Sequence, residues 1–243
     1  MHLPDGTTAP SPVPAELSTG DIDRVVRDHA AAARRAIDAG FDGVELHGAN
    51  SYLTHQFLAD GTNLRRDGYG GSTTGRMRLA VELVEALGEA VGADRVGVRL
   101  SPGNPQFGMV ERDPAPLYRG LLAELDRHGL AYLHLTDDDR YPALADLRPR
   151  WRGTLVANVG ENREATTRAS AERVLAAGHA DAVSFGRGFL RNPDLVDRLR
   201  HDLPWNPLDE ARLYTPGPGG YTDYPRHGGA SAGPRSAGTD RPT

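Results

Sequence analysis

Cysteine and lysine are both absent from this chain of 243 residues, and all 28 of its basic residues are arginine. Without cysteine the chain can form no disulfide, thiolate metal site, iron–sulfur cluster or cysteine nucleophile, so a redox role would need a borrowed cofactor. Without lysine it can form neither a Schiff base nor a phosphate-binding loop of the lysine type. Guanidinium groups remain available for binding anions.

Positive charge and long apolar stretches are also scarce. The formal net charge of -5 disfavours a nucleic-acid or anionic membrane surface, because both need a concentrated positive field. No run of about 18 apolar residues occurs, and the N-terminal segment lacks the apolar centre of a signal peptide. We therefore expect a cytoplasmic protein that binds a small molecule, with no nucleic-acid partner, no membrane partner and no metal site.

Both ends of the chain differ in composition from its middle. Residues 1–17 are rich in proline, and residues 226–243 are rich in glycine, proline, serine and alanine. These compositions predict an irregular N-terminal segment and a disordered tail. The apolar content of 38% is sufficient for one core, so residues 18–225 are expected to form a single domain.

A pattern of helix, glycine and short strand repeats through that domain. Residues 21–40 place apolar side chains on one helical face, with Ser18 and Asp21 suited to a capping box and Gly40 to the helix end. Strands are predicted at residues 41–46, 96–100, 131–135, 154–158 and 182–185. Alternating strands and helices predict a parallel sheet, either in a (β/α)8 barrel about 100 residues short of closure or in a doubly wound open sheet.

Polar residues follow these strands, where βα folds bind their ligands. His47 and Asn50 could donate paired hydrogen bonds to an oxyanion, with Tyr52 as a nearby proton donor, or they could simply satisfy the loop backbone. Arg99 lies inside an apolar strand and needs an anionic partner or a ligand; within the chain, Glu45 is the candidate partner.

The last two predicted strands end in glycine-containing loops that suit a phosphate group. Gly160 follows one strand, and Gly186 with Arg187 follows the other. Glycine lets backbone N–H groups approach phosphate oxygens, and a guanidinium binds two oxygens at once. The residues alone leave a phosphate site and an ordinary loop as equal alternatives.

Taken together, these segments resemble the Old Yellow Enzyme-like group of FMN-dependent ene-reductases, the NADH:flavin oxidoreductase family. The motifs that carry the resemblance, in the family's order, are residues 36–53, 55–58, 63–72, 98–102, 132–136, 185–195 and 220–225. Residues 3–6 are similar to the segment that follows the family's third strand. The resemblance implies strands four to eight of a TIM-type (β/α)8 barrel, incomplete because it lacks the first three β/α units.

The resemblance also implies an activity and a role for each site residue. The family reduces electron-poor, enone-type alkenes with FMN and electrons from NADH or NADPH. His47 and Asn50 would hold the substrate carbonyl oxygen, Tyr52 would protonate Cα, and Arg99 would lie at the N1/O2 edge of the flavin. The implied phosphate-binding residues are Gly160, Gly186 and Arg187.

The sequence departs from the family pattern in three places. Residues 73–75 replace a Glu-Asn pair that supports a helix start, the loop over residues 159–167 is longer than usual, and residues 137–139 are acidic.

The missing strands would leave apolar edges at Val44 and Val183. Three alternatives remain: a second copy or a complementing chain completes the flavin site, the sequence is truncated, or the short form is non-catalytic. A phosphate-binding barrel of isomerase or aldolase type is a further alternative.

Overall fold

The computed structural model describes residues 13–137, 140–160 and 165–228. Its strands are β1 (Val44–Gly48), β2 (Val96–Leu100), β3 (Tyr132–Thr136), β4 (Leu155–Asn158) and β5 (Ala182–Val183). All neighbours pair in parallel, and the order across the sheet follows the order in the chain. A doubly wound sheet reverses its strand order at a switch point, so the sequential order excludes that alternative and indicates the wall of a barrel.

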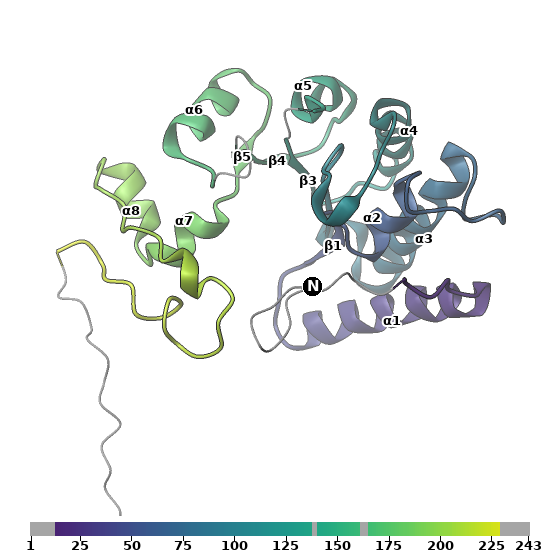
Figure 1. Ribbon diagram of the computed structural model, residues 1–243, viewed down its shortest axis with the longest axis horizontal. Helices are drawn as coiled ribbons and strands as arrows, with labels where there is room; N and C mark the ends of the chain where they lie inside the picture. The colour runs from purple at the N-terminus through teal and green to yellow at the C-terminus, as the bar shows by residue number, and fades with distance from the viewer. Residues whose placement is uncertain (1–12, 138–139, 161–164, 229–243) are drawn as a thin grey trace, which may run out of the picture.

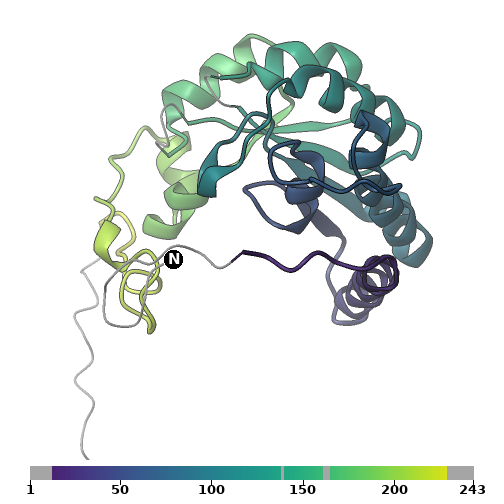
Figure 2. The same cartoon turned by 45° about the vertical axis from the view of Figure 1, so that its right-hand side comes forward.

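Helices cover one side of this wall and leave the other open. Figure 1 shows the strands in an arc with helices α3 to α6 along its convex side, and Figure 2 shows the open concave side. The prediction of an incomplete (β/α)8-type barrel is confirmed. The helices are α1 (Thr19–Asp38), α2 (Leu53–Leu58), α3 (Thr73–Val91), α4 (Pro114–Leu125), α5 (Ala143–Leu147), α6 (Arg168–Ala176), α7 (Gly186–Arg191) and α8 (Leu195–Arg200). Short 3-10 turns lie at η1 (Ala93–Arg95), η2 (Gln106–Gly108), η3 (Arg148–Arg150) and η4 (Glu210–Arg212).

The two faces of the sheet have opposite chemistry. Successive side chains on a strand point to opposite faces, and the residues facing the helices are aliphatic and buried. The residues facing the concave side are mostly polar and partly accessible. The core therefore lies between sheet and helices, and the polar face remains for binding. The buried outward residues include Leu46, Val96, Val98, Leu100, Leu133, Leu135, Leu155 and Ala157.

The predicted first helix is confirmed, including its ends. Ser18 Oγ accepts a hydrogen bond from the Asp21 N–H at 3.1 Å, and Asp21 Oδ2 accepts one from the Ser18 N–H at 3.2 Å. Gly40 follows the helix with a φ of 96°, a conformation that favours glycine.

The strand boundaries were predicted less accurately. β1 begins at Val44, its first pair with β2, and β5 is limited to Ala182 and Val183, the two residues that pair with β4.

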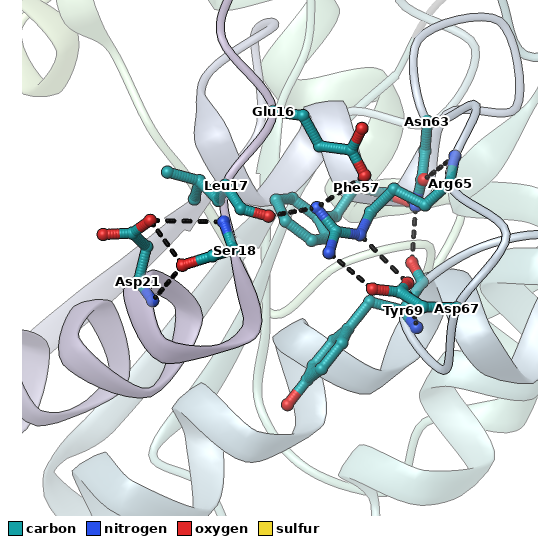
Figure 3. A network of polar contacts seen from close by, with 9 residues as sticks. All are labelled: Glu16, Leu17, Ser18, Asp21, Phe57, Asn63, Arg65, Asp67 and Tyr69. Atoms are coloured by element: carbon teal, nitrogen blue, oxygen red, sulfur yellow. Dashed lines mark hydrogen bonds and ion pairs between the residues drawn. The ribbon is translucent and has the colours of Figure 1, made fainter.

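Arg65 joins the entry of α1 to the loop after α2, as Figure 3 shows. Its guanidinium donates to the Leu17 carbonyl at 2.6 Å and to Asp67 Oδ1 at 3.0 Å, and Glu16 Oε1 lies 3.4 Å away. The guanidinium also lies 5.7 Å from the centre of the Phe57 ring. Only 9% of the side chain is exposed, so one largely buried arginine connects residues 16 and 17 to the loop after α2.

Replacing Arg65 with methionine is expected to lower the free energy of unfolding by about 1–3 kcal/mol, because the Leu17 carbonyl and Asp67 lose a charged hydrogen-bond donor. Urea denaturation would measure the loss. Arg66 is exposed and provides the matched control: Arg66→Met should change stability by less than about 0.5 kcal/mol. Equal losses in the two variants would contradict the role assigned to Arg65.

The strands at the two ends of the arc each have one neighbour among the described residues. This confirms the predicted open edges at Val44 and Val183, both of which are only partly buried. Residues 13–17 contain no helix or strand, and the rest of the predicted irregular segment and most of the predicted tail lie outside the described residues. Within the part of the chain that is described, no helix is both long and apolar enough to span a membrane.

Candidate active site

A hollow of about 810 Å³ opens at the carboxyl ends of the strands. Five residues predicted from sequence lie on its wall: Asn50, Arg99, Gly160, Gly186 and Arg187. They come from four different strand ends, which a parallel barrel brings to one rim. The remaining lining residues are Asn104, Pro105, Gln106, Phe107, Thr136, Asp137, Arg140, Asn158, Ala165, Thr166 and Tyr214.

Arg99 extends from β2 into this hollow without forming an ion pair to a described carboxylate. Its Nη2 donates to Thr136 Oγ1 and Asn158 Oδ1, each at 3.3 Å, and both partners are neutral. Burial lowers the pKa of Arg99, and the charge of Glu45 only partly offsets that effect. Glu45, the candidate partner within the chain, forms no ion pair with Arg99 because it hydrogen-bonds to His134, which leaves the predicted alternative of a ligand. A half-buried guanidinium with neutral partners suits an anionic or electron-rich ligand.

Hydrogen-bonded polar side chains from β1, β3 and the residue after β5 form a row on the concave face. His134 Nδ1 lies 3.0 Å from Glu45 Oε2, and His134 Nε2 lies 2.9 Å from Ser184 Oγ. Burial raises the pKa of Glu45, but the hydrogen bonds from His134 and Tyr132 and the charges of His134 and Arg99 together lower it below its ordinary value. Burial and Glu45 together raise the pKa of Tyr132 to about 12. Gly97 makes this arrangement possible, because a Cβ there would lie 2.3 Å from the Tyr132 ring.

His47 and Tyr52 lie beside the hollow, towards the free edge of β1. His47 is the register partner of Arg99 on the adjacent strand, so both side chains emerge on the concave face. The rings of His47 and Tyr52 have centroids 4.9 Å apart, and Tyr52 is 59% exposed. Neither residue belongs to the wall of the hollow, because the sheet ends at β1 and no described strand encloses them on that side.

The pKa of His47 is lowered, first by burial and second by the positive charge of Arg99. A folded-state pKa below the ordinary 6.5 means that His47 contributes stability at higher pH, which is lost as the pH falls and the ring must be charged. We expect Arg99→Met to move the His47 pKa upwards but not fully to its ordinary value, since burial remains. An NMR titration of the His47 ring would measure the shift. Arg200→Met, at an exposed arginine, should leave the titration unchanged, and an unmoved pKa in Arg99→Met would contradict the assigned cause.

Asn50 is held at the rim by a tight turn between β1 and α2. Asn50 and Ser51 have φ values of 54° and 69°, left-handed conformations that cost non-glycine residues roughly 1–2 kcal/mol each. The Asn50 N–H donates to Ser101 Oγ at 2.8 Å, and Asn104 Nδ2 lies 3.4 Å from Asn50 Oδ1. Since the side-chain oxygen of Asn50 accepts from Asn104, its side-chain nitrogen Nδ2 remains to donate to a ligand.

The glycines of the predicted phosphate site lie on the same hollow as Arg187. The long loop after β4 includes residues 161–164, which are outside the described residues, as are two of the acidic positions after β3. Sequence reasoning missed Asn104, Phe107 and Tyr214, which also line the hollow. They lie in connections rather than at strand ends, so the rule of inspecting strand ends could not identify them.

Comparison with known proteins agrees with this geometry. The family model for the NADH:flavin oxidoreductase / NADH oxidase family matches residues 3–206. The chain belongs to this family. It is 42% identical over 233 residues to a protein named putative 12-oxophytodienoate reductase 5 from Oryza sativa subsp. japonica, with 91% of this chain and 61% of the relative covered.

Two solved structures are similar to most of this chain. The structure of morphinone reductase in complex with tetrahydroNAD gives a TM-score of 0.84 at 40% identity, covering 99% of this chain and 64% of that one. The old yellow enzyme homologue from Zymomonas mobilis gives 0.81 at 35% identity, covering 86% and 60%. The chain therefore spans about three fifths of the length of the relatives it matches, and the predicted family and TIM-type barrel are confirmed.

Proposed function

We propose that this family member forms the FMN-binding side of an NAD(P)H-dependent reductase for enone-type alkenes, with residues 18–225 as the flavin-binding domain. The observation that carries the proposal is Arg99, a half-buried guanidinium with neutral partners in a hollow that also contains Gly160, Gly186 and Arg187. Such a set fits an electron-rich ring joined to a phosphate. Bound FMN would supply hydride transfer, which no side chain of this cysteine-free chain can provide.

The chain's own residues have separate tasks in this proposal. Arg99 would stabilise negative charge on the reduced ring, and Arg187 with the glycine backbone would bind the phosphate. His47 and Asn50 would donate hydrogen bonds to the substrate carbonyl oxygen and polarise the alkene. Tyr52, whose ring lies 4.9 Å from that of His47, would donate a proton to Cα while Cβ receives the hydride.

A redox titration tests this proposal directly. Purified protein mixed with FMN should acquire flavin absorbance, lose it anaerobically on addition of NADH or NADPH, and regain it on addition of an enone such as 2-cyclohexenone. A protein that binds no flavin would overturn the proposal. Using both nicotinamides separately would identify the donor that the sequence leaves open.

The free edges of β1 and β5 favour a second candidate, in which this chain completes its flavin site only in an assembly. Each edge strand has one neighbour among the described residues, and Glu45 and His47 on β1 are exposed on the concave side. Unpaired strand edges are surfaces for pairing with another chain. Native mass spectrometry would distinguish the candidates, because a flavin-loaded monomer supports the first and flavin found only in a dimer or heteromer supports the second.

A further inference from the structure

The turn that carries Asn50 is bound to a histidine that does not face the hollow. The Ser51 N–H donates to His55 Nδ1 at 3.0 Å, one turn later on α2. Ser51 also donates through its hydroxyl to the Gln106 carbonyl at 2.6 Å. The left-handed φ of Ser51 is therefore held from two sides, by α2 and by the connection between β2 and α4.

His55 is fully buried, and its second nitrogen faces a carboxylate. Because Nδ1 accepts a hydrogen bond from Ser51, the ring proton lies on Nε2. Nε2 lies 3.4 Å from Glu111 Oε1, with 0% of the His55 side chain and 3% of the Glu111 side chain exposed. The contact with Glu111 is electrostatic, because among the described residues no group forms a hydrogen bond to this buried nitrogen. The negative charge of Glu111 therefore lies on the Nε2 side of the imidazole and favours a proton on that nitrogen.

Glu111 is in turn fixed by two further donors. The Gly103 N–H donates to Glu111 Oε2 at 2.6 Å, and the Tyr118 hydroxyl donates to Oε1 at 2.7 Å. Burial and the charge of Glu111 raise the pKa of Tyr118 well above its ordinary value, so its phenol keeps the proton that it donates. Gly103 directly precedes Asn104, the residue next to the Asn50 amide. One buried carboxylate therefore binds the loop that carries Asn104 and contacts the histidine that binds the Asn50 turn.

We propose that Glu111 and His55 act as a positioning pair, which fixes the turn over residues 49–52 and thereby aims the Asn50 amide into the hollow. Neither residue touches the ligand. Glu111 selects the imidazole tautomer with its proton on Nε2, and that tautomer leaves Nδ1 to accept from Ser51. The consequence for alkene reduction rests on the proposed function, whereas the effect on the turn does not.

Amide hydrogen exchange in the chain itself tests the pair without any flavin. Glu111→Gln keeps the shape but removes the charge beside His55 and leaves one oxygen for the Gly103 and Tyr118 donors, so the Ser51 amide should exchange about 10-fold faster, as expected when a bond of about 1.4 kcal/mol is lost. Amides in β3, at the core of the sheet, should keep their wild-type rates. Glu172→Gln, at an exposed glutamate on α6, is the matched control and should change neither.

Two histidine variants separate positioning from simple filling of the core. In His55→Asn the side-chain oxygen can take the place of Nδ1 and still accept from Ser51, whereas in His55→Gln the polar end is placed near Nε2. We expect protection of Ser51 to be largely retained in His55→Asn and lost in His55→Gln. The ring of wild-type His55 should also show the Nε2–H tautomer in its ¹⁵N chemical shifts.

The outcomes are separable from those of the proposed function. Unchanged exchange at Ser51 in Glu111→Gln, equal protection in the two histidine variants, or the opposite tautomer would overturn the pair, whether or not the protein binds flavin. In flavin-loaded protein, Glu111→Gln should slow reoxidation by the enone about 10-fold or more while sparing reduction by nicotinamide, because misplacing one substrate-binding group by about 1 Å costs up to about 100-fold. Equal slowing of both half-reactions would also count against the pair.

Discussion

Tyr52→Phe is expected to slow reoxidation of the reduced flavin by an enone about 100- to 10,000-fold, the usual contribution of a positioned general acid. Reduction by NADH or NADPH should keep its wild-type rate, because that step requires no proton from Tyr52. Phenylalanine retains the ring that lies 4.9 Å from His47 and removes only the hydroxyl. Anaerobic stopped-flow measurement of the two half-reactions would show whether the loss falls on one of them.

Tyr221 provides the control for this substitution. Its hydroxyl donates to the Leu213 carbonyl, and the residue does not line the hollow. Tyr221→Phe should therefore leave both half-reactions near their wild-type rates. If Tyr52→Phe slowed both half-reactions equally, the proton-donor role would be wrong and the substitution would have disturbed flavin binding instead.

Arg187→Ala is expected to weaken FMN binding about 10- to 150-fold, which corresponds to the roughly 1.5–3 kcal/mol of a hydrogen bond to a charged group. Arg187 lies on the wall of the hollow with Gly160 and Gly186, where a guanidinium can bind two phosphate oxygens. The rate of hydride transfer in fully loaded protein should change far less, since the phosphate is remote from the reacting ring. Isothermal titration calorimetry with FMN would measure the affinity.

Riboflavin, which has the same ring without the phosphate, sharpens this test. Its affinity should be the same for Arg187→Ala as for the wild type, whereas FMN should lose affinity only in the variant. Arg200→Ala, at an exposed arginine of α8, should alter neither. If Arg187→Ala weakened riboflavin as much as FMN, the phosphate assignment would be contradicted.

The fold could be predicted well because its signals are local and repeated. The capping box at Ser18 and Asp21 and the glycine at position 40 act within one helix, so their geometry follows from spacing alone. Strand order and barrel curvature came from the resemblance to a family, because apolar strands of similar length fit an open sheet equally well. The short β5 could not be predicted, since its length depends on which neighbours pair with it.

Arg99 could be predicted as a site residue, because a charged side chain inside an apolar strand has few roles other than binding a partner or a ligand. Of the two partners that the sequence left open for Arg99, Glu45 forms its hydrogen bond with His134 instead, and a ligand remains. The second layer of the site was not foreseen. His55 on α2 and Glu111 in the connection between β2 and α4 are distant in the sequence and meet only through tertiary packing. No periodic pattern encodes such a contact.

The alternation of side chains along the strands has a consequence for how this scaffold can change. Positions that face the helices, such as Leu133 and Leu135, are fully buried, and truncating either to alanine would cost about 2–5 kcal/mol. Positions that face the concave side, such as His134 and Thr136, contribute little to that apolar layer. Mutant libraries restricted to the inward-facing positions can therefore explore new ligand preferences while the scaffold keeps most of its thermal tolerance.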